Sequence, residues 1–248
     1  MLWAVVQQVQ KIFIDSRHLA FCAYCGNAPV TRDHVPPRVF LDKPYPDNVP
    51  VVGSCFECNN DASRDEEYVA CLLEAAVCNS VDPSLIQRPG IARILQRRPT
   101  LAARIGAALT PNGLSLTSDD LQRIARVLSK MARGLWRFEC GEPTGAAEAT
   151  VTWCPLPTLT ASEAEQFFAL EDQYFYPEIG SRMFIRYFSG EDAFGWQEVQ
   201  ADRFSYLIQT DGLVKMVVRG YLAAEVLLVE GGCVHRTAPP SLPSPRLG

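Results

Sequence analysis

The stretch Cys22–Pro37 reads CAYCGNAPVTRDHVPP, and it decides how the N-terminal part of the chain folds. It opens with a Cys-x-x-Cys pair, Cys22 and Cys25, and a second pair, Cys55-Phe-Glu-Cys58, follows after 29 residues. Two such pairs in loop context predict a tetrahedral zinc site of four thiolates, with four unrelated buried cysteines as the alternative. The loop between the pairs is rich in proline and poor in apolar residues, so we expect a bound metal to supply folding free energy.

The composition is that of a globular protein without a membrane partner. The 248 residues are 48% hydrophobic, which is enough for one large or two modest domains. No apolar run approaches the roughly 20 residues that span a bilayer, and the N-terminus shows no secretory signal. Nine cysteines, an odd number, favour a reducing compartment over a disulfide framework, so we expect a cytoplasmic protein.

The sequence predicts an α+β fold: an N-terminal zinc-stabilised module, a helical middle segment and a β-rich C-terminal domain. Helical periodicity covers 63–78, with Ser63 and Glu66 as a capping box, and a second helical region is broken at Pro99. The later apolar runs, RMFIRYF (182–188) among them, favour strands. The expected divisions are a lead-in at 1–20, the zinc module at 21–80, a basic helical segment at 81–140, the β-rich domain at 149–235 and a disordered tail at 236–248.

Asp33 and His34 lie between the two cysteine pairs, together with Asn48, and Asn59 follows the second pair. The order CAYCG (22–26), DHVPP (33–37), DNVPVV (47–52) and CFECNN (55–60) resembles the motif of HNH endonucleases, whose core is a ββα-metal module with a four-cysteine zinc site. The resemblance covers about residues 21–70, roughly a fifth of the chain.

The resemblance implies a role for each of these residues. His34 would be the general base, and Asp33 and Asn59 would hold one catalytic Mg²⁺ or Mn²⁺ besides the structural Zn²⁺. Asn48 would brace the loop that carries His34 by a hydrogen bond to the backbone. A pKa near 6.5 leaves an imidazole largely neutral at pH 7, as a base must be. Strand geometry points Asp33 and His34 to opposite sides, so the two can do separate jobs.

A basic stripe is expected on the helix that ends near residue 140. Its members recur at intervals of three and four residues: Arg123, Arg126, Lys130, Arg133 and Arg137. Such a stripe indicates either contact with nucleic-acid phosphates or neutralisation by the acidic C-terminal region. Further basic residues extend this region with less regular spacing: Arg88, Arg93, Arg97, Arg98 and Arg104.

These features together predict a metal-dependent HNH-type endonuclease that hydrolyses nucleic acid, with DNA as the favoured substrate. The alternative is a zinc-ribbon module that binds nucleic acid or protein without catalysis. The two differ in whether Asp33, His34 and Asn59 converge on a second, oxygen-rich metal site.

Overall fold

A computed structural model describes residues 19–111, 113–141, 144, 148–170, 178–209, 212–229 and 242 of this chain. The described residues form the α+β fold that the sequence predicts, with helices around a five-stranded antiparallel sheet. Among the described helices, none combines the length and the apolar character that crossing a membrane requires. The lead-in at 1–18 and most of the tail lie outside the described residues.

The N-terminal part is a β-hairpin followed by helices. Strand β1 (Thr31–His34) pairs antiparallel with β2 (Val51–Ser54), which sets Asp33 opposite Val52 and His34 opposite Val51. The connecting loop contains the short 3-10 helix η1 (Arg38–Phe40). Helix α2 (Phe56–Asp61) follows β2 directly, and α3 (Ser63–Cys78) continues from α2 through Ala62.

The predicted helix over 63–78 is confirmed, but its predicted capping box is wrong. Ala62 is the N-cap of α3 and offers no side-chain hydrogen bond, and the Ser63 hydroxyl donates instead to the carbonyl of Asn60. The chain enters α3 from α2 in helical conformation, so no extended N-cap residue is present to accept from the first turn. Glu66 is thereby left to pair elsewhere.

The middle segment contains α4 (Pro89–Arg97), α5 (Pro99–Ala108), a small hairpin of β3 (Leu109–Thr110) and β4 (Gly113–Leu114), and α6 (Ser118–Cys140). The predicted break at Pro99 is confirmed, because proline ends one helix and suits the first position of the next. Thr117 and Asp120 form a reciprocal capping box at the start of α6. Gly141 ends α6 at φ 81°, a left-handed conformation that favours glycine.

The C-terminal part is built on one sheet of strand order β5-β9-β8-β7-β6. The strands are β5 (Glu148–Pro155), β6 (Gln197–Gln200), β7 (Phe204–Ile208), β8 (Leu213–Val218) and β9 (Leu222–Val229). Between β5 and β6 lie η2 (Leu156–Thr158), α7 (Ala161–Phe168) and α8 (Arg182–Phe188).

Helix α8 corrects the strand predicted for RMFIRYF. The Ser181 hydroxyl caps this helix by accepting from the amide of Phe184 at 3.1 Å. Met183 and Arg186, which are three residues apart, are its buried side chains. A good cap and a helical burial pattern therefore outweigh the strand preference of the aromatic and β-branched residues.

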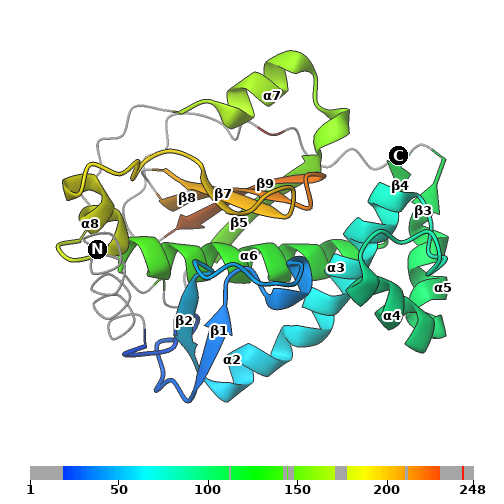
Figure 1. Cartoon of the computed structure of the whole chain (residues 1–248), viewed down its shortest axis with the longest axis horizontal. Coiled ribbons are helices and arrows are strands. Elements are labelled where there is room, and N and C mark those ends of the chain that lie inside the picture. Colours follow the sequence, from blue (N-terminus) through cyan, green and yellow to red (C-terminus); the bar gives the residue numbers. More distant parts are fainter. Residues whose placement is uncertain are drawn as a thin grey trace.

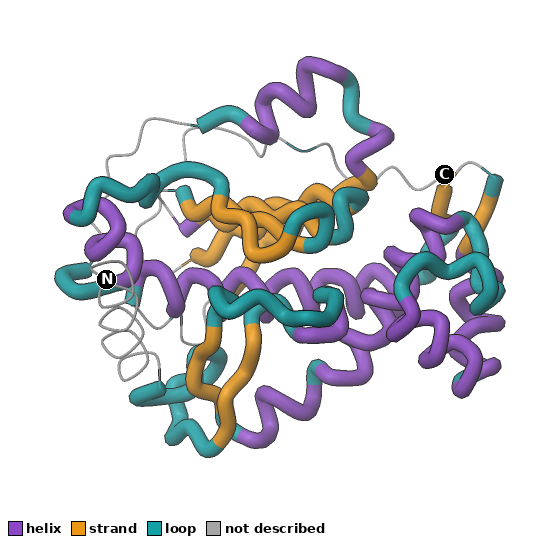
Figure 2. Tube along the Cα trace, in the orientation of Figure 1, coloured by secondary structure: helices purple, strands orange, loops and turns teal. Residues whose placement is uncertain are grey.

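Helix α6 connects the two parts of the molecule. The β1–β2 hairpin and α3 pack on one side of it, and the five-stranded sheet packs on the other (Figures 1 and 2). Its apolar residues Leu128, Met131 and Leu135 are almost completely buried, and each contributes roughly 1.5–3 kcal/mol of burial free energy. One hydrophobic cluster runs from Cys22 to Leu228 across α6, so the expected domains share a core.

Candidate functional site

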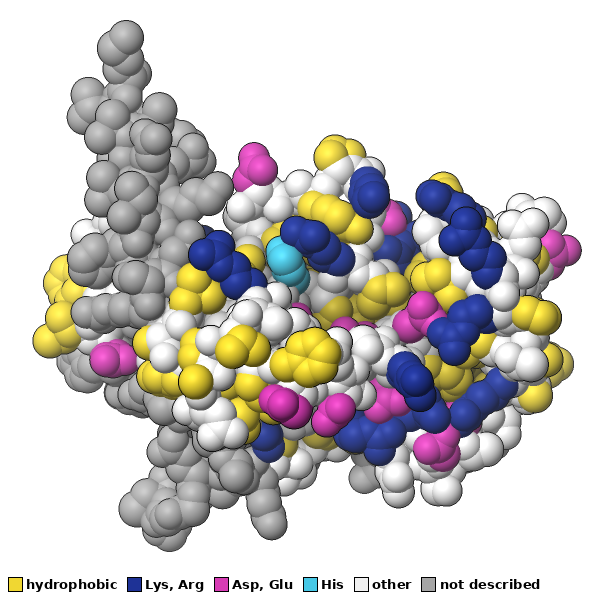
Figure 3. Space-filling model, turned by 90° about the horizontal axis from the view of Figure 1, so that it is seen from below, with side chains coloured by type: hydrophobic (Ala, Val, Ile, Leu, Met, Phe, Trp, Pro, Cys, Tyr) yellow, Lys and Arg dark blue, Asp and Glu magenta, His cyan; other side chains and the backbone are white. Residues whose placement is uncertain are grey.

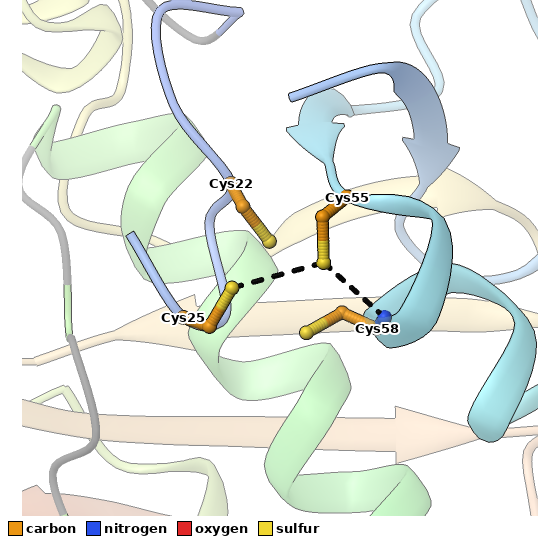
Figure 4. Close-up of side chains that lie close together, drawn as sticks. All are labelled: Cys22, Cys25, Cys55 and Cys58. Carbon is orange, nitrogen blue, oxygen red and sulfur yellow. Dashed lines mark hydrogen bonds between the residues drawn. The ribbon is translucent and has the colours of Figure 1, made fainter. Parts of the chain in front are cut away.

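Four cysteine thiols meet at the base of the hairpin. Cys22 and Cys25 come from the loop before β1, Cys55 is the N-cap of α2, and Cys58 lies in the first turn of that helix (Figure 4). The four Sγ atoms lie within 4.8 Å of one another, and those of Cys25 and Cys55 are 3.7 Å apart. A tetrahedron of Zn–S bonds of about 2.3 Å has sulfur atoms about 3.8 Å apart. The predicted four-cysteine cluster is confirmed, and its geometry fits zinc.

The surroundings of the thiols favour metal binding. Burial acts to raise the pKa of Cys22, but hydrogen bonds from the backbone amides of Cys55, Tyr24 and Cys25 outweigh burial and lower it to about 7. Burial and the neighbouring thiols raise the pKa of Cys58. Without a cation, one thiol therefore ionises readily and another resists ionisation. A Zn²⁺ ion held by the four cysteines would supply the charge that lets all four become thiolates, with release of protons.

Asp33 is buried and is already neutralised within the protein. Its carboxylate accepts from the Tyr24 hydroxyl at 2.9 Å and pairs with Lys130 Nζ at 2.7 Å. The same ammonium pairs with Glu66 at 2.7 Å, so one cation of α6 bridges a carboxylate of β1 and one of α3. Burial alone would lower the pKa of Lys130, but Asp33 and Glu66 outweigh it and raise that pKa.

His34 lies on the other face of β1, since successive strand residues alternate. It is half-buried, and burial is the main cause that lowers the pKa of its imidazole. The nearby Arg38 lowers the pKa further, and Asp33 offsets only part of the shift. His34 is thus held neutral at physiological pH, next to an exposed arginine. Figure 3 shows Lys and Arg side chains gathered beside the histidine on this face.

Among the described residues, neither Asn59 nor Asn48 forms a hydrogen bond with His34. The side-chain nitrogen Nδ2 of Asn59 donates to Thr31 Oγ1 at 3.1 Å. Thr31 lies two residues before Asp33 on β1, a distance along the strand of roughly 7 Å. Asn48 is exposed in the turn before β2, and its side chain makes no hydrogen bond with any described residue. The hydrogen bond expected to brace the loop is therefore absent among the described residues.

The three residues expected to meet at a catalytic cation do not converge. Asp33 is ion-paired with Lys130, and Asn59 is hydrogen-bonded to Thr31. His34 lies on the face of β1 opposite to Asp33. Within the described ranges, the four cysteines are the one group of three or more His, Cys, Asp or Glu side chains close enough to hold a metal. Asp33 and Asn59 are engaged by Lys130 and Thr31, and these contacts do not suit the Mg²⁺ or Mn²⁺ site that the resemblance implies.

The basic stripe of α6 is largely ion-paired inside the chain. Arg123 and Arg126 bind the two carboxylate oxygens of Asp65 at 2.9 and 2.8 Å, and Arg123 also pairs with Asp119. The acids that pair with Arg123 and Arg126 come from α3 and from α6 itself, whereas Glu178 of the C-terminal region acts on Arg137 and opposes the lowering of its pKa by burial. Nearer the end of α6, burial lowers the pKa of Arg133, and Arg137 lies 3.9 Å from the centre of the Phe21 ring.

Two contributors to the site were missed at the level of sequence. Tyr24 lies between the first two cysteines and donates a hydrogen bond to Asp33, and no local pattern in the sequence indicates this contact. Asp65 and Glu66 of α3 form ion pairs with Arg123 and Lys130 of the basic stripe, whereas the sequence predicts only a capping role for Glu66. The complementary charge on two amphipathic helices was the available signal.

Comparisons of this chain with protein-family models, with curated proteins and with solved structures found no match. The likeness to HNH endonucleases therefore depends on the quoted motif residues alone.

Proposed function

We propose that this protein is an HNH-type endonuclease that hydrolyses phosphodiester bonds of nucleic acid, with His34 as the general base. One observation carries the proposal. A half-buried imidazole with a lowered pKa stands at the end of β1, the strand that follows the first cysteine pair, beside the exposed guanidinium of Arg38. A neutral base next to a fixed cation is what attack of water on a phosphodiester requires.

The described residues divide this chemistry between them. The imidazole of His34 takes a proton from water as the water oxygen bonds to phosphorus. The bond from phosphorus to the leaving oxygen breaks, its electron pair stays with that oxygen, and the oxygen takes a proton from solvent water. Arg38 offsets the negative charge that builds on the phosphate oxygens, because an arginine fork matches phosphate geometry. The zinc site has a positioning role, since it ties the loop before β1 to the N-terminus of α2.

The proposed hydrolysis does not use the divalent cation that the resemblance to HNH endonucleases implies. With Asp33 paired to Lys130, a cation would first have to displace a buried ammonium. The test should therefore compare cleavage with no added cation, with Mg²⁺ and with Mn²⁺.

The deciding experiment incubates purified zinc-loaded protein with supercoiled plasmid and with labelled single strands. We expect His34→Ala to lose about 10²–10⁴-fold of the cleavage rate, the usual contribution of a general base. His34→Gln serves as the matched control, because it keeps a polar side chain and cannot take the proton. Undiminished cleavage by both variants would refute the role of His34.

A non-catalytic binding module is the second candidate, and the Lys130–Asp33 ion pair favours it. An acid that is permanently neutralised stabilises the fold but is unsuited to hold a catalytic metal. Binding of nucleic acid without cleavage, under every cation condition, would select this candidate.

A further inference from the structure

A basic groove lies between the loop after β1 and helix α4. It encloses about 640 Å³, and Arg38, which lines it, is the arginine that lowers the pKa of His34. Its lining holds five basic residues and one acidic one, Asp42. Asp42 is fully engaged, since its two oxygens pair with Arg88 at 2.7 Å and with Arg203 at 2.5 Å. The wall of the groove is thereby fixed, and its remaining charge is positive.

Four of the basic side chains are exposed and available to a ligand. Among the described residues, none of them has a carboxylate within ion-pair distance: Arg38, Lys43, Arg93 and Arg97. This is the reverse of the α6 stripe, where Arg123, Arg126 and Lys130 are paired with buried or partly buried acids. Unpaired cations around a concavity favour an anionic ligand. In Figure 3 the Lys and Arg side chains extend from beside the histidine toward the right of the view.

The groove also has an apolar floor and an aromatic ring. Leu41 and Ile91 are buried beneath it, Ile94 is half-buried, and Tyr45 lines it with Arg38 at 5.3 Å and Lys43 at 5.8 Å from the ring centre. A duplex offers phosphates to such a surface but keeps its bases stacked inside. A single strand offers both phosphates and base faces, and grooves that combine cations with an aromatic ring suit it.

We infer that this groove binds a single-stranded segment of nucleic acid, with phosphates on the four exposed cations and a base against Tyr45 and the apolar floor. The inference rests on the proposed function for the class of ligand, and it adds the form of the strand and its path toward His34. The binding surface is then α4 and the loop after β1, and not the basic stripe of α6.

Gly90 allows a clean test. It lines the groove near the start of α4, and a Cβ placed there meets no atom within 4 Å. Gly90→Glu therefore adds a negative charge without a clash, at a helix start that tolerates acids, and Gly90→Gln is its neutral match. Fluorescence anisotropy of a labelled 12-nucleotide oligothymidylate, with full-length zinc-loaded protein and no added Mg²⁺ or Mn²⁺, measures binding without cleavage.

We expect Gly90→Glu to bind the oligonucleotide at least tenfold more weakly than Gly90→Gln. We also expect Arg97→Ala to reduce the slope of log affinity against log salt by about 0.7, one phosphate contact. A duplex of the same length should bind at least tenfold more weakly than the single strand. Equal affinities of the Glu and Gln variants, equal or tighter duplex binding, or no binding by the wild type would each overturn the inference. Unaltered cleavage by His34→Ala would refute the proposed role of His34 in catalysis but would not affect the inference that the groove binds a single strand.

Discussion

Replacing Lys130 with methionine removes the one cation shared by two buried carboxylates. The ammonium lies 2.7 Å from an oxygen of Asp33 and 2.7 Å from one of Glu66, and these acids are 7% and 8% exposed. Methionine keeps the length of the side chain but leaves both acids without their partner. Tyr24 still donates to Asp33, but a neutral hydroxyl does not replace a charge.

We expect Lys130→Met to lower the free energy of unfolding by about 3–5 kcal/mol, the usual cost of breaking a buried ion pair from one side. The cost should depend on pH. Burial already raises the pKa of Glu66, and loss of the ammonium raises it further. A folded-state pKa above the unfolded value means that stability is lost as pH rises through the folded pKa and is recovered toward pH 4.5. The deficit should therefore shrink between pH 8 and pH 5.

Urea unfolding of zinc-loaded wild type, Lys130→Met and Arg126→Met measures these differences. Arg126 lies on the same helix and pairs with Asp65, but its side chain is 53% exposed, so its removal should cost only about 0–1 kcal/mol. A Lys130→Met deficit no larger than that of Arg126→Met, or one that grows as the pH falls, would refute the reasoning.

Three other expectations follow from the same structure. Cys55→Ser, or removal of the metal with a chelator, should release zinc and unfold the hairpin. Zinc content and hydrogen exchange at β1 and β2 measure this, and an intact hairpin would contradict a structural zinc. The cleavage rate should rise with pH through a midpoint below 6.5, because the pKa of His34 is lowered and its neutral form is the active one. A pH–rate profile with a midpoint above 6.5 would count against His34 as the base. Thr117→Ala should lower the free energy of unfolding by about 0.5–2 kcal/mol, because it removes the cap of α6. Urea unfolding measures this, with Thr158→Ala as the control, since the Thr158 hydroxyl donates only to the nearby carbonyl of Pro155 at an exposed position.

Local patterns in the sequence were sufficient for the cysteine cluster and for several helix limits. The spacing of Cys22, Cys25, Cys55 and Cys58 predicts their meeting, because each pair forms a short knuckle whose geometry depends on neighbouring residues. The helix over 63–78 and the break at Pro99 also follow from local periodicity and from the missing amide of proline. The strand predicted for RMFIRYF (182–188) is wrong because a helix cap and a helical burial pattern, which only packing defines, outweigh its strand propensity.

What Asp33 and the basic residues do was decided by the tertiary structure. Periodicity shows that Lys130 lies on one face of a helix, but it does not show which element packs against that face. Lys130 meets Asp33 and Glu66 because α6 packs on both the hairpin and α3, which brings together residues 97 and 64 positions apart. The same packing pairs Arg123, Arg126 and Lys130 of the stripe with acids of the chain, and the exposed cations of the groove beside α4 have no carboxylate partner among the described residues. Residue types and local geometry are written in the sequence, whereas the pairing of charges depends on contacts between distant elements, which form only when the chain is folded.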